Sequence, residues 1–503
     1  MFDRGSGILM PISSIPSKFG IGTFGKEAYN YIDFLCESGQ RYWQLLPLGP
    51  VSYGDSPYSP FSIYAGNPYY IDLELLIEEG ILSLKDCEIL DSDDGYVNYD
   101  KQFKLRYNVL YKAYENSKCY KNEVRMFCQN NKWVLDYSMF MALKYRFNQM
   151  PWKEWGKGIF DRNENFLEEY RMLLSDQIEF WSFLQCVFYR QYHKLKKYAN
   201  KNGIRIIGDM PIYVSEDSVE AWAERELFVR DDNNNLSLEA GVPPDIFSET
   251  GQLWGNPVYN WGYLKENSYK WWINRLNWSV KLYDAVRVDH FRGFDEFWAV
   301  KAGSEDAVNG KWYPAEGREM FELAVSNIKG LNIIAEDLGV ITDSVIELKN
   351  KLNFPGMKVL QFAFDGNPDN PHLPYNYEEN SVAYTGTHDN DTLKGWLVKL
   401  NDETKSCVLK SMNLGEKLSI NEIVEGLIKK VMCSKANLAV IPMQDYLLLD
   451  SSARINTPST VGGNWMWRAK KEDFTPELAK KIKSLTEISG RFKEAIAITI
   501  TSY

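Results

Sequence analysis

Residues 283–295 read Tyr-Asp-Ala-Val-Arg-Val-Asp-His-Phe-Arg-Gly-Phe-Asp, an apolar run that ends in a cluster of charged residues. The run predicts a buried β-strand that leads into a functional site. Side chains alternate along a strand, so Arg287 and Asp289 should project from one face while the flanking valines project from the other. A neighbouring guanidinium keeps a carboxylate ionised, as a nucleophile must be. An isolated Arg-x-Asp pair is also compatible with a purely structural ion pair.

Apolar, β-rich runs of this kind recur along the chain, and helical sequence separates most of them. The runs lie at residues 7–12, 41–50, 203–214, 284–289, 332–339, 356–365, 381–391 and 437–445. Short apolar strands that alternate with helices are typical of a parallel sheet in an α/β protein. Eight such units predict a closed (β/α)8 barrel of the TIM type. A doubly wound open sheet is the alternative.

The predicted barrel accounts for the whole chain, residues 1–503, as one catalytic domain with two insertions. Residues 73–175 have the spaced apolar positions of helices and few breakers, which predicts a helical insertion within the barrel. Residues 213–265 include the Gly/Pro-dense stretch AGVPPDIFSETGQLWGNPVYNW, which predicts a loop-rich insertion over the active face. Too little sequence follows the last strand for a C-terminal β-domain.

Composition limits the class of partner. The formal net charge is −11, the pI is near 5.2, and no basic block resembles a nucleic-acid footprint. Nucleic acid and anionic membranes are therefore not expected as partners. No signal-peptide pattern and no apolar run of about 18 residues occur, which predicts a cytoplasmic protein. The seven cysteines form no C-x-x-C pair and should be reduced.

Two further sequence features bear on the ligand. Gly20, Gly22 and Gly25 match the G-x-G-x-x-G motif of dinucleotide sites, but the next strand ends in prolines instead of an acidic residue, which argues against that ligand. Aromatic residues make up 14% of the chain, and many lie in polar loops. Flat apolar rings beside amides and carboxylates suit a sugar chain, which has apolar ring faces and a rim of hydroxyls.

Acidic residues follow four of the predicted strands: Asp209, Asp289, Glu336 and Asp389. The C-terminal strand ends of a (β/α)8 barrel form its active face, so these residues should lie together. Four carboxylates at one mouth repel one another unless cations, hydrogen bonds or a substrate compensate. A structural role alone would therefore be costly, and the cluster predicts catalysis.

Two chemistries use such a cluster of acids. One is a divalent metal site, including proton abstraction assisted by Mg²⁺, for which His290 and His388 lie beside the acids; only four histidines occur in the chain. The other is glycosyl transfer, which needs an ionised carboxylate as nucleophile and a protonated carboxyl to assist the leaving oxygen. Asp289 beside Arg287 fits the first role, and Glu336, with apolar neighbours, fits the second.

The same segments resemble a known family. VRVDHFRG, IIAEDLG and TGTHDND look like the nucleophile, acid/base and third-acid motifs of the α-amylase clan. GDMPIYV, ETGQLWGNPVYNW, DSPYSPFS and VGGNWMWR are similar to motifs of the narrower amylomaltase family, the 4-α-glucanotransferases or disproportionating enzymes. The order and spacing of these motifs carry the resemblance, which covers nearly the whole chain.

This resemblance implies roles for individual residues. Asp289 would form a covalent glucosyl-enzyme intermediate, Glu336 would act as acid and then as base, and Asp389 would bind sugar hydroxyls in the distorted transition state. Positions that would bind the glucan are Tyr58, Asp209, Gln252, Trp254, Arg287, His388 and Asn464. The resemblance requires no cofactor and no bound metal.

The implied reaction moves a segment of an α-1,4-glucan to the 4-hydroxyl of glucose or of another α-1,4-glucan, with retention of configuration. The expected partners are α-1,4-glucans and maltooligosaccharides, with glucose as acceptor. A retaining α-glucan hydrolase with the same acids is the alternative within this chemistry. A glucan-binding protein with an inactive site is the alternative outside it, and three intact acids argue against it.

Overall fold

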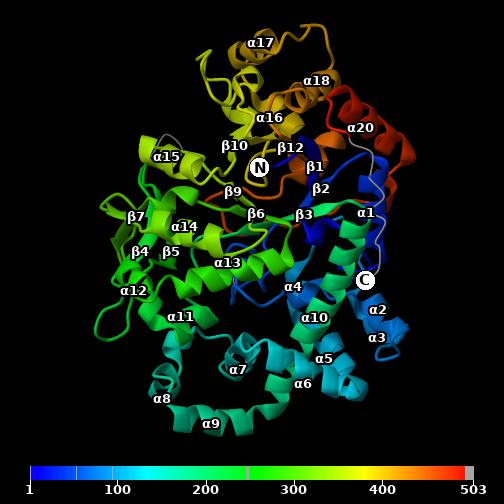
Figure 1. The fold of residues 1–503 in the computed structure, drawn as a ribbon. Coiled ribbons are helices and arrows are strands. Elements are labelled where there is room, and N and C mark those ends of the chain that lie inside the picture. The colour runs from blue at the N-terminus through cyan, green and yellow to red at the C-terminus, as the bar shows by residue number, and fades with distance from the viewer. Residues whose placement is uncertain (1, 53, 93–94, 245–247, 493–503) are drawn as a thin grey trace.

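The protein folds around a sheet of parallel strands that surrounds a common axis (Figure 1). The structure is a computed structural model, and it describes residues 2–52, 54–92, 95–244 and 248–492. In the order in which they pair, the strands are β10 (Gly356–Val359), β11 (Ser381–Tyr384), β12 (Leu438–Pro442), β1 (Gly5–Leu9), β2 (Tyr42–Gln44), β3 (Arg205–Met210), β6 (Ala285–Val288) and β9 (Ile333–Ala335). Every one of these pairings is parallel.

The two outer strands of this sheet, β9 and β10, meet and close the barrel. The backbone N–H of Ala335 in β9 donates to the carbonyl of Pro355, directly before β10, at 2.9 Å. The carboxylate of Asp337 accepts a hydrogen bond from the N–H of Met357 at 2.6 Å. A Cβ on Gly356 would lie 2.1 Å from that carboxylate, so a side chain does not fit there. The predicted (β/α)8 barrel is confirmed, and the open doubly wound sheet is not formed.

α-Helices follow every strand of the barrel except β10 and cover the outside of the barrel. They are α1 (Lys26–Glu37), α10 (Ser175–Lys201), α13 (Lys270–Leu282), α14 (Gly317–Asn327), α15 (Asp343–Lys351), α16 (Leu393–Lys399), α17 (Asp402–Ser411), α18 (Ile420–Met432), α19 (Met443–Tyr446) and α20 (Pro476–Ile488). Because helices cover one face of each strand and the barrel interior covers the other, the strands are uninterrupted apolar runs; Ile8, Ile206 and Val440 are fully buried. No helix in the described part of the chain combines the length and apolar character needed to cross a membrane.

A long run of helices separates β2 from α10. It consists of α2 (Leu73–Glu78), α3 (Leu84–Cys87), α4 (Tyr99–Lys101), α5 (Tyr107–Glu115), α6 (Lys121–Asn130), α7 (Trp133–Arg146), α8 (Lys157–Phe160) and α9 (Glu164–Leu173). In Figure 1, α5 to α9 extend below the barrel. These helices fall within residues 73–175, which we propose to be one insertion into a single catalytic domain.

A second, antiparallel sheet was not predicted. Its strands, in pairing order, are β5 (Gln252–Pro257), β4 (Leu238–Val242), β7 (Glu296–Lys301) and β8 (Lys311–Pro314). The segment predicted to be loop-rich, residues 213–265, therefore supplies two paired strands, together with α11 (Val219–Ala223) and α12 (Trp261–Glu266). The pairing between β4 and β5 is irregular at Gly241, and the density of glycine and proline there hid the strand pattern.

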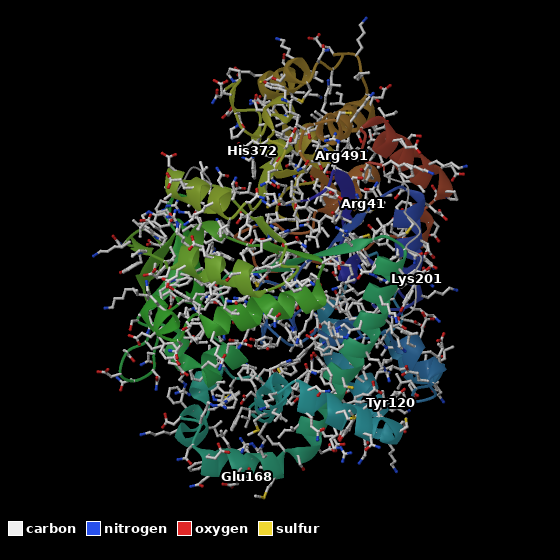
Figure 2. All side chains as sticks on the ribbon, viewed as in Figure 1. Arg41, Tyr120, Glu168, Lys201, His372 and Arg491 are labelled. Carbon is white, nitrogen blue, oxygen red and sulfur yellow. The ribbon has the colours of Figure 1, made fainter. Side chains whose placement is uncertain are left out.

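Arg491 joins the beginning of the described chain to its end. Its buried guanidinium donates hydrogen bonds to the carbonyl oxygens of Gly5, Met432, Ser434, Ala436 and Asn437. Figure 2 shows Arg491 where the blue N-terminal part of the chain meets the orange and red C-terminal part. One side chain thus ties β1 to the segment between α18 and β12.

Candidate active site

Neighbouring strands bring three of the predicted acids to the same end of the barrel. Asp209 in β3 lies opposite Arg287 in β6 in the register of the sheet. Asp289 follows β6, and Glu336 follows β9 and donates its N–H to the carbonyl of Val288 at 3.1 Å. Because the strands are parallel and adjacent, the residues that follow them meet at one edge, as the sequence predicts.

Arg287 is the charge that allows two of these carboxylates to approach each other. Its Nη1 donates to both oxygens of Asp209 at 2.8 Å, and its Nη2 lies 2.9 Å from Oδ1 of Asp289. Asp209 and Arg287 are buried, whereas the Asp289 side chain remains 29% exposed. Asp209 is predicted to contact the substrate; in the structure its carboxylate binds Arg287, and Asp289 is the more accessible acid of the two.

Glu336 is held by two backbone donors and has a perturbed pKa. The N–H of His290 donates to its Oε2 at 2.7 Å, and the N–H of Leu338 donates to its Oε1 at 2.9 Å. Desolvation by the surrounding strand ends raises the pKa of Glu336 to about 7; the positive charge of Arg287 opposes this rise, and the negative charge of Asp289 adds to it. A carboxyl group with this pKa can donate and accept a proton near neutral pH.

Asp389 lies on the turn after β11, beside His388. Nε2 of His388 is 3.3 Å from Oδ2 of Asp389, and the His388 ring stacks on Tyr58 with 5.0 Å between ring centroids. The Tyr58 hydroxyl donates to Asp209 at 2.8 Å, which links this turn to the Arg287 pair. Burial alone would raise the pKa of Asp389, but His388 and a hydrogen bond from Asn456 outweigh it and hold that pKa well below its usual range. Asp389 is therefore ionised at neutral pH.

Two residues that the sequence did not reveal hold Asp389 in place. Nδ2 of Asn456 donates to Oδ1 of Asp389 at 2.6 Å, and Nη2 of Arg454 donates to the Asp389 carbonyl at 2.6 Å. The N–H of Asn456 also donates to the carbonyl of His388 at 3.1 Å. Both residues lie in the segment ARINTP, whose position shortly before the VGGNWMWR motif was the available signal.

Trp254 and Gln252 lie together on β5. The Trp254 ring meets the ring of His290 edge-on at 5.0 Å between centroids, and its Nε1 donates to Oε1 of Gln252 at 3.2 Å. His290 directly follows Asp289, so Trp254 packs against the neighbour of this acid, and Gln252 binds Trp254. Residues 245–247, which belong to the same predicted segment, lie outside the described residues.

Asn464 is not joined to the acids. Its Oδ1 accepts from the N–H of Thr457 at 2.9 Å, and its Nδ2 donates to the carbonyl of Thr460 at 3.2 Å, so its side chain closes its own loop. The next residue, Trp465, reaches Tyr58 with 5.8 Å between ring centroids. The predicted motif therefore contacts the site through its first tryptophan.

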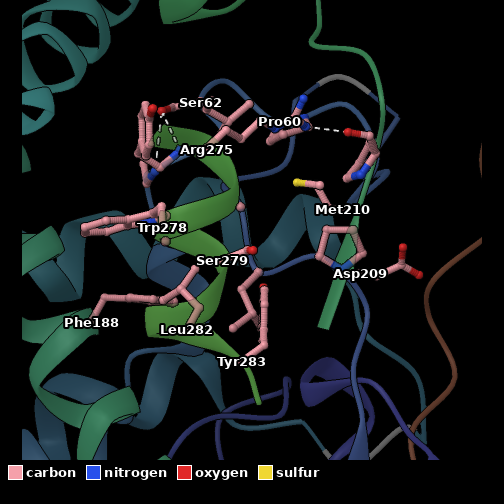
Figure 3. A pocket seen from close by; sticks show the side chains of 18 of the residues that line it. Pro60, Ser62, Phe188, Asp209, Met210, Arg275, Trp278, Ser279, Leu282 and Tyr283 are labelled. Atoms are coloured by element: carbon pink, nitrogen blue, oxygen red, sulfur yellow. Dashed lines mark hydrogen bonds between the residues drawn. The ribbon is translucent and has the colours of Figure 1, made fainter. Parts of the chain in front are cut away.

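A cavity of about 60 Å³ lies next to Asp209 (Figure 3). Arg275 and Trp278 of α13 line it, together with Tyr283 directly after that helix and Ser62 of the loop after β2. Figure 3 shows the Asp209 carboxylate pointing away from the other labelled side chains. The volume suffices for a few water molecules, but it is far below the roughly 300–1,000 Å³ of typical ligand pockets. The cavity is therefore too small for the sugar chain that the sequence predicts as ligand.

Protein groups balance the charges of the four acids. Arg287 contacts Asp209 and Asp289, and His388 contacts Asp389. The fourth acid, Glu336, accepts hydrogen bonds from two backbone N–H groups. Within the ranges that the structure describes, no group of three or more His, Cys, Asp or Glu side chains is arranged to hold a metal ion. The repulsion between carboxylates is thus compensated by Arg287, His388 and the backbone.

Comparison with known proteins decides the family. The model of a protein family described as 4-alpha-glucanotransferase matches residues 10–473. The chain belongs to the 4-alpha-glucanotransferase family. This membership confirms the predicted family and the predicted activity, glucan transfer.

Members of the 4-alpha-glucanotransferase family match this chain over nearly its full length. The 4-alpha-glucanotransferase of Clostridium butyricum is 48% identical over 96% of this chain and 100% of its own, and that of Thermus thermophilus is 42% identical over 97% and 99%. Among solved structures, an amylomaltase from Streptococcus agalactiae in complex with acarbose has a TM-score of 0.94 and 43% identity, covering 97% of this chain and 100% of the other.

Proposed function

We propose that the enzyme moves a segment of an α-1,4-glucan to the 4-hydroxyl of glucose or of another α-1,4-glucan through a covalent intermediate on Asp289. The observation that carries this proposal is the pair formed by Asp289 and Glu336. One carboxylate is accessible and paired with Arg287, and the other carboxyl has a pKa of about 7. A retaining mechanism needs such a pair. Family membership and the acarbose complex of the Streptococcus agalactiae amylomaltase support oligosaccharide substrates.

In the first displacement, protonated Glu336 donates its proton to the glycosidic oxygen as the bond to the leaving sugar breaks. Asp289 Oδ attacks the anomeric carbon and forms an ester with the donor glucosyl residue. Arg287 holds Asp289 in orientation through the contact at 2.9 Å. Asp389, which is ionised, accepts hydrogen bonds from sugar hydroxyls and favours the positive charge that develops on the sugar.

In the second displacement, Glu336 is a carboxylate and removes the proton from the 4-hydroxyl of the acceptor. The acceptor oxygen attacks the anomeric carbon, and Asp289 leaves as a carboxylate. Two inversions give net retention. Water attacking the same ester gives hydrolysis, so the preference for transfer depends on how well the acceptor is held and water is excluded.

Aromatic rings around the acids are the proposed glucan contacts. Tyr58 and Trp465 contact His388, the neighbour of Asp389, and Trp254 contacts His290, the neighbour of Asp289. Rings of this kind pack against the apolar faces of sugars. The other proposed contacts of the glucan are polar, namely Asp209, Gln252, Arg287, His388 and Asn464.

Incubation with maltotriose tests this proposal. Transfer should give glucose together with maltopentaose and longer oligomers, while the concentration of reducing ends stays constant, because each bond broken is matched by one formed. A hydrolase would raise the concentration of reducing ends in step with glucose. Asp289→Asn should abolish both product classes, since a neutral amide cannot form the ester. Rapid growth of reducing ends with the unmodified enzyme would instead support the retaining α-glucan hydrolase.

We also propose that the enzyme works in the cytoplasm. All seven cysteines are free thiols in the structure, two of them buried and two exposed. Thiols at the surface persist in a reducing compartment, whereas secreted proteins tend to oxidise them. Fluorescence microscopy of a tagged enzyme, with a secreted protein as reference, tests this location.

A further inference from the structure

One buried carboxylate, that of Asp445, binds both ends of the segment that carries Asp389. Asp445, in α19 directly after β12, is 1% exposed. Its Oδ2 accepts from the hydroxyl of Thr385 at 2.6 Å, and its Oδ1 accepts from the backbone N–H of Leu393 at 2.7 Å. Thr385 directly follows β11 and Leu393 begins α16, so the two bonds hold both ends of residues 385–393.

His388 and Asp389 lie in the middle of this segment. Besides Tyr58, which stacks on His388, two residues from the chain after β12 contact them there, Arg454 and Asn456. Asp445 fixes the ends of the segment, and these two residues fix its centre. The position of Asp389 relative to the acids on β6 and β9 is therefore set from the neighbouring strand, β12.

Burial strengthens the two hydrogen bonds that Asp445 accepts from Thr385 and Leu393. Thr385 and Leu393 are also buried, and hydrogen bonds to an ionised group in dry surroundings are stronger than those between neutral groups. Burial raises the pKa of Asp445 to about 6, and the two donors oppose this rise. Removal of the carboxylate would leave a hydroxyl and an N–H without an acceptor, and the segment would shift to satisfy them.

We propose that Asp445 is a positioning residue for transfer: by holding both ends of residues 385–393, it places Asp389 and His388 against the sugar in the transition state. This inference rests on the proposed role of Asp389. A displacement of about 1 Å in a catalytic group can lower the rate about 100-fold. Asp445 itself does not touch the substrate in this proposal.

The chain offers a matched control for the test. Asp72 is 3% exposed, and it accepts from the hydroxyl of Thr23 at 2.6 Å and from the N–H of Leu75 at 2.8 Å. Like Asp445, Asp72 thus accepts one hydrogen bond from a threonine hydroxyl and one from a backbone N–H. The bonds of Asp72 hold the start of α2, however, and do not involve residues 385–393. Asp72→Ala should therefore reproduce the loss of stability without the loss of positioning.

The experiment compares Asp445→Ala with Asp72→Ala by Tm and by kcat and KM on maltotriose. Both variants should lower Tm. Asp445→Ala should also lower kcat about 100-fold with little change in KM, because the lost contact acts in the transition state. Asp445→Asn, which keeps an oxygen for Leu393 and can donate to the Thr385 oxygen, should recover much of that kcat. Equal kcat in the two alanine variants would overturn the proposal.

A second pair of variants decides the matter if Asp445→Ala does not fold. Thr385→Val and Thr23→Val each replace one buried hydroxyl by a methyl group of similar shape, and only Thr385→Val should lower kcat. Equal kcat in both valine variants would overturn the proposal.

Asp389→Asn separates this inference from the proposed function. If Asp389→Asn is fully active, the proposed role of Asp389 is wrong. If Asp389→Asn is inactive while Asp445→Ala and Thr385→Val are fully active, only the proposed positioning role of Asp445 is wrong.

Discussion

A single guanidinium between two carboxylates organises the site at the scale of residues. The planar fork of Arg287 binds both oxygens of Asp209 with one nitrogen and Asp289 with another. A lysine ammonium is a point charge on a flexible stem and cannot hold both partners in this geometry. The position therefore requires arginine and not merely a positive charge.

Arg287→Lys tests this requirement. We expect kcat to fall about 10²- to 10³-fold because Asp289 loses its orientation, and Tm to fall as well because lysine cannot replace both contacts in this buried site. Arg171→Lys, on an exposed helix where arginine contacts Glu164 and Glu168, is the control and should leave both values unchanged. Wild-type kcat in Arg287→Lys would mean that the Arg287 contacts serve the fold alone.

The pKa of Glu336 predicts the pH dependence of the enzyme. The first displacement needs the protonated carboxyl, so kcat/KM should be highest below the pKa and fall as pH rises through about 7. Glu336→Gln should lose almost all activity on maltotriose but retain more on α-maltosyl fluoride, whose leaving group needs no proton. Stopped assays across a buffer series measure both. A kcat/KM that stays flat from about pH 6 to about pH 9 would contradict the role of Glu336 as acid.

At the scale of elements, the antiparallel sheet supplies the side chains that border the acids from outside the barrel. β5 places Trp254 against His290, and β7 and β8 support β5 through β4. Positive backbone φ values of 68° at Gly251 and 69° at Gly255 bracket the tryptophan, and glycine tolerates them readily. Gly251 directly precedes β5 and Gly255 lies within it, where the pairing with β4 is irregular, so the tryptophan sits at the irregular part of the strand.

Trp254→Ala should change the fate of the covalent intermediate. Without the ring, the acceptor sugar is held less firmly and water reaches the ester more easily, so the ratio of hydrolysis to transfer on maltotriose should rise. Trp312→Ala is a control in the same sheet, because that ring packs on Arg292 and Trp298. If both rates fall together in Trp254→Ala and their ratio stays constant, the ring only supports the fold.

The seam between β9 and β10 gives a prediction about stability. Gly356→Ala would put a Cβ 2.1 Å from the Asp337 carboxylate, which also binds the Lys349 ammonium at 2.7 Å. We expect the variant to lose about 1–3 kcal/mol of unfolding free energy. Gly156→Ala, where a Cβ meets nothing within 4 Å, is the control and should not lose stability. Thermal unfolding of the two variants measures the difference, and equal Tm values would mean that the seam relaxes around the methyl group.

At the scale of the whole molecule, the burial of a strand determined whether that strand could be predicted from the sequence. A barrel strand is covered on both faces, so it reads as one apolar run, and the polar residue that ends it stands out; Asp209, Asp289 and Glu336 were all found in this way. The strands β7 and β8 are partly exposed, and their partners β4 and β5 lie in a segment rich in glycine and proline. Nothing in those sequences showed that they pair.

Contacts between distant segments were the other limit of prediction. Asn456 and Arg454 bind Asp389 across 67 and 65 residues of sequence, and no periodicity connects such positions. Asn464 was found by its motif, yet a motif does not determine which way a side chain turns. Thr457 and Thr460 offer partners within its own loop, and the amide binds them.

The first strand is the point where the beginning and the end of the chain meet, because β1 pairs with β2 on one side and with β12 on the other. About 430 residues separate Gly5 from its partner Leu438, and a ribosome needs roughly 20 to 90 s to add them at about 5–20 residues per second. Throughout that time one edge of β1 carries unpaired N–H and carbonyl groups, to which strands of other chains can bind. The nascent enzyme is therefore prone to aggregate until its final strand emerges, and chaperones that bind extended apolar segments would protect it during this interval.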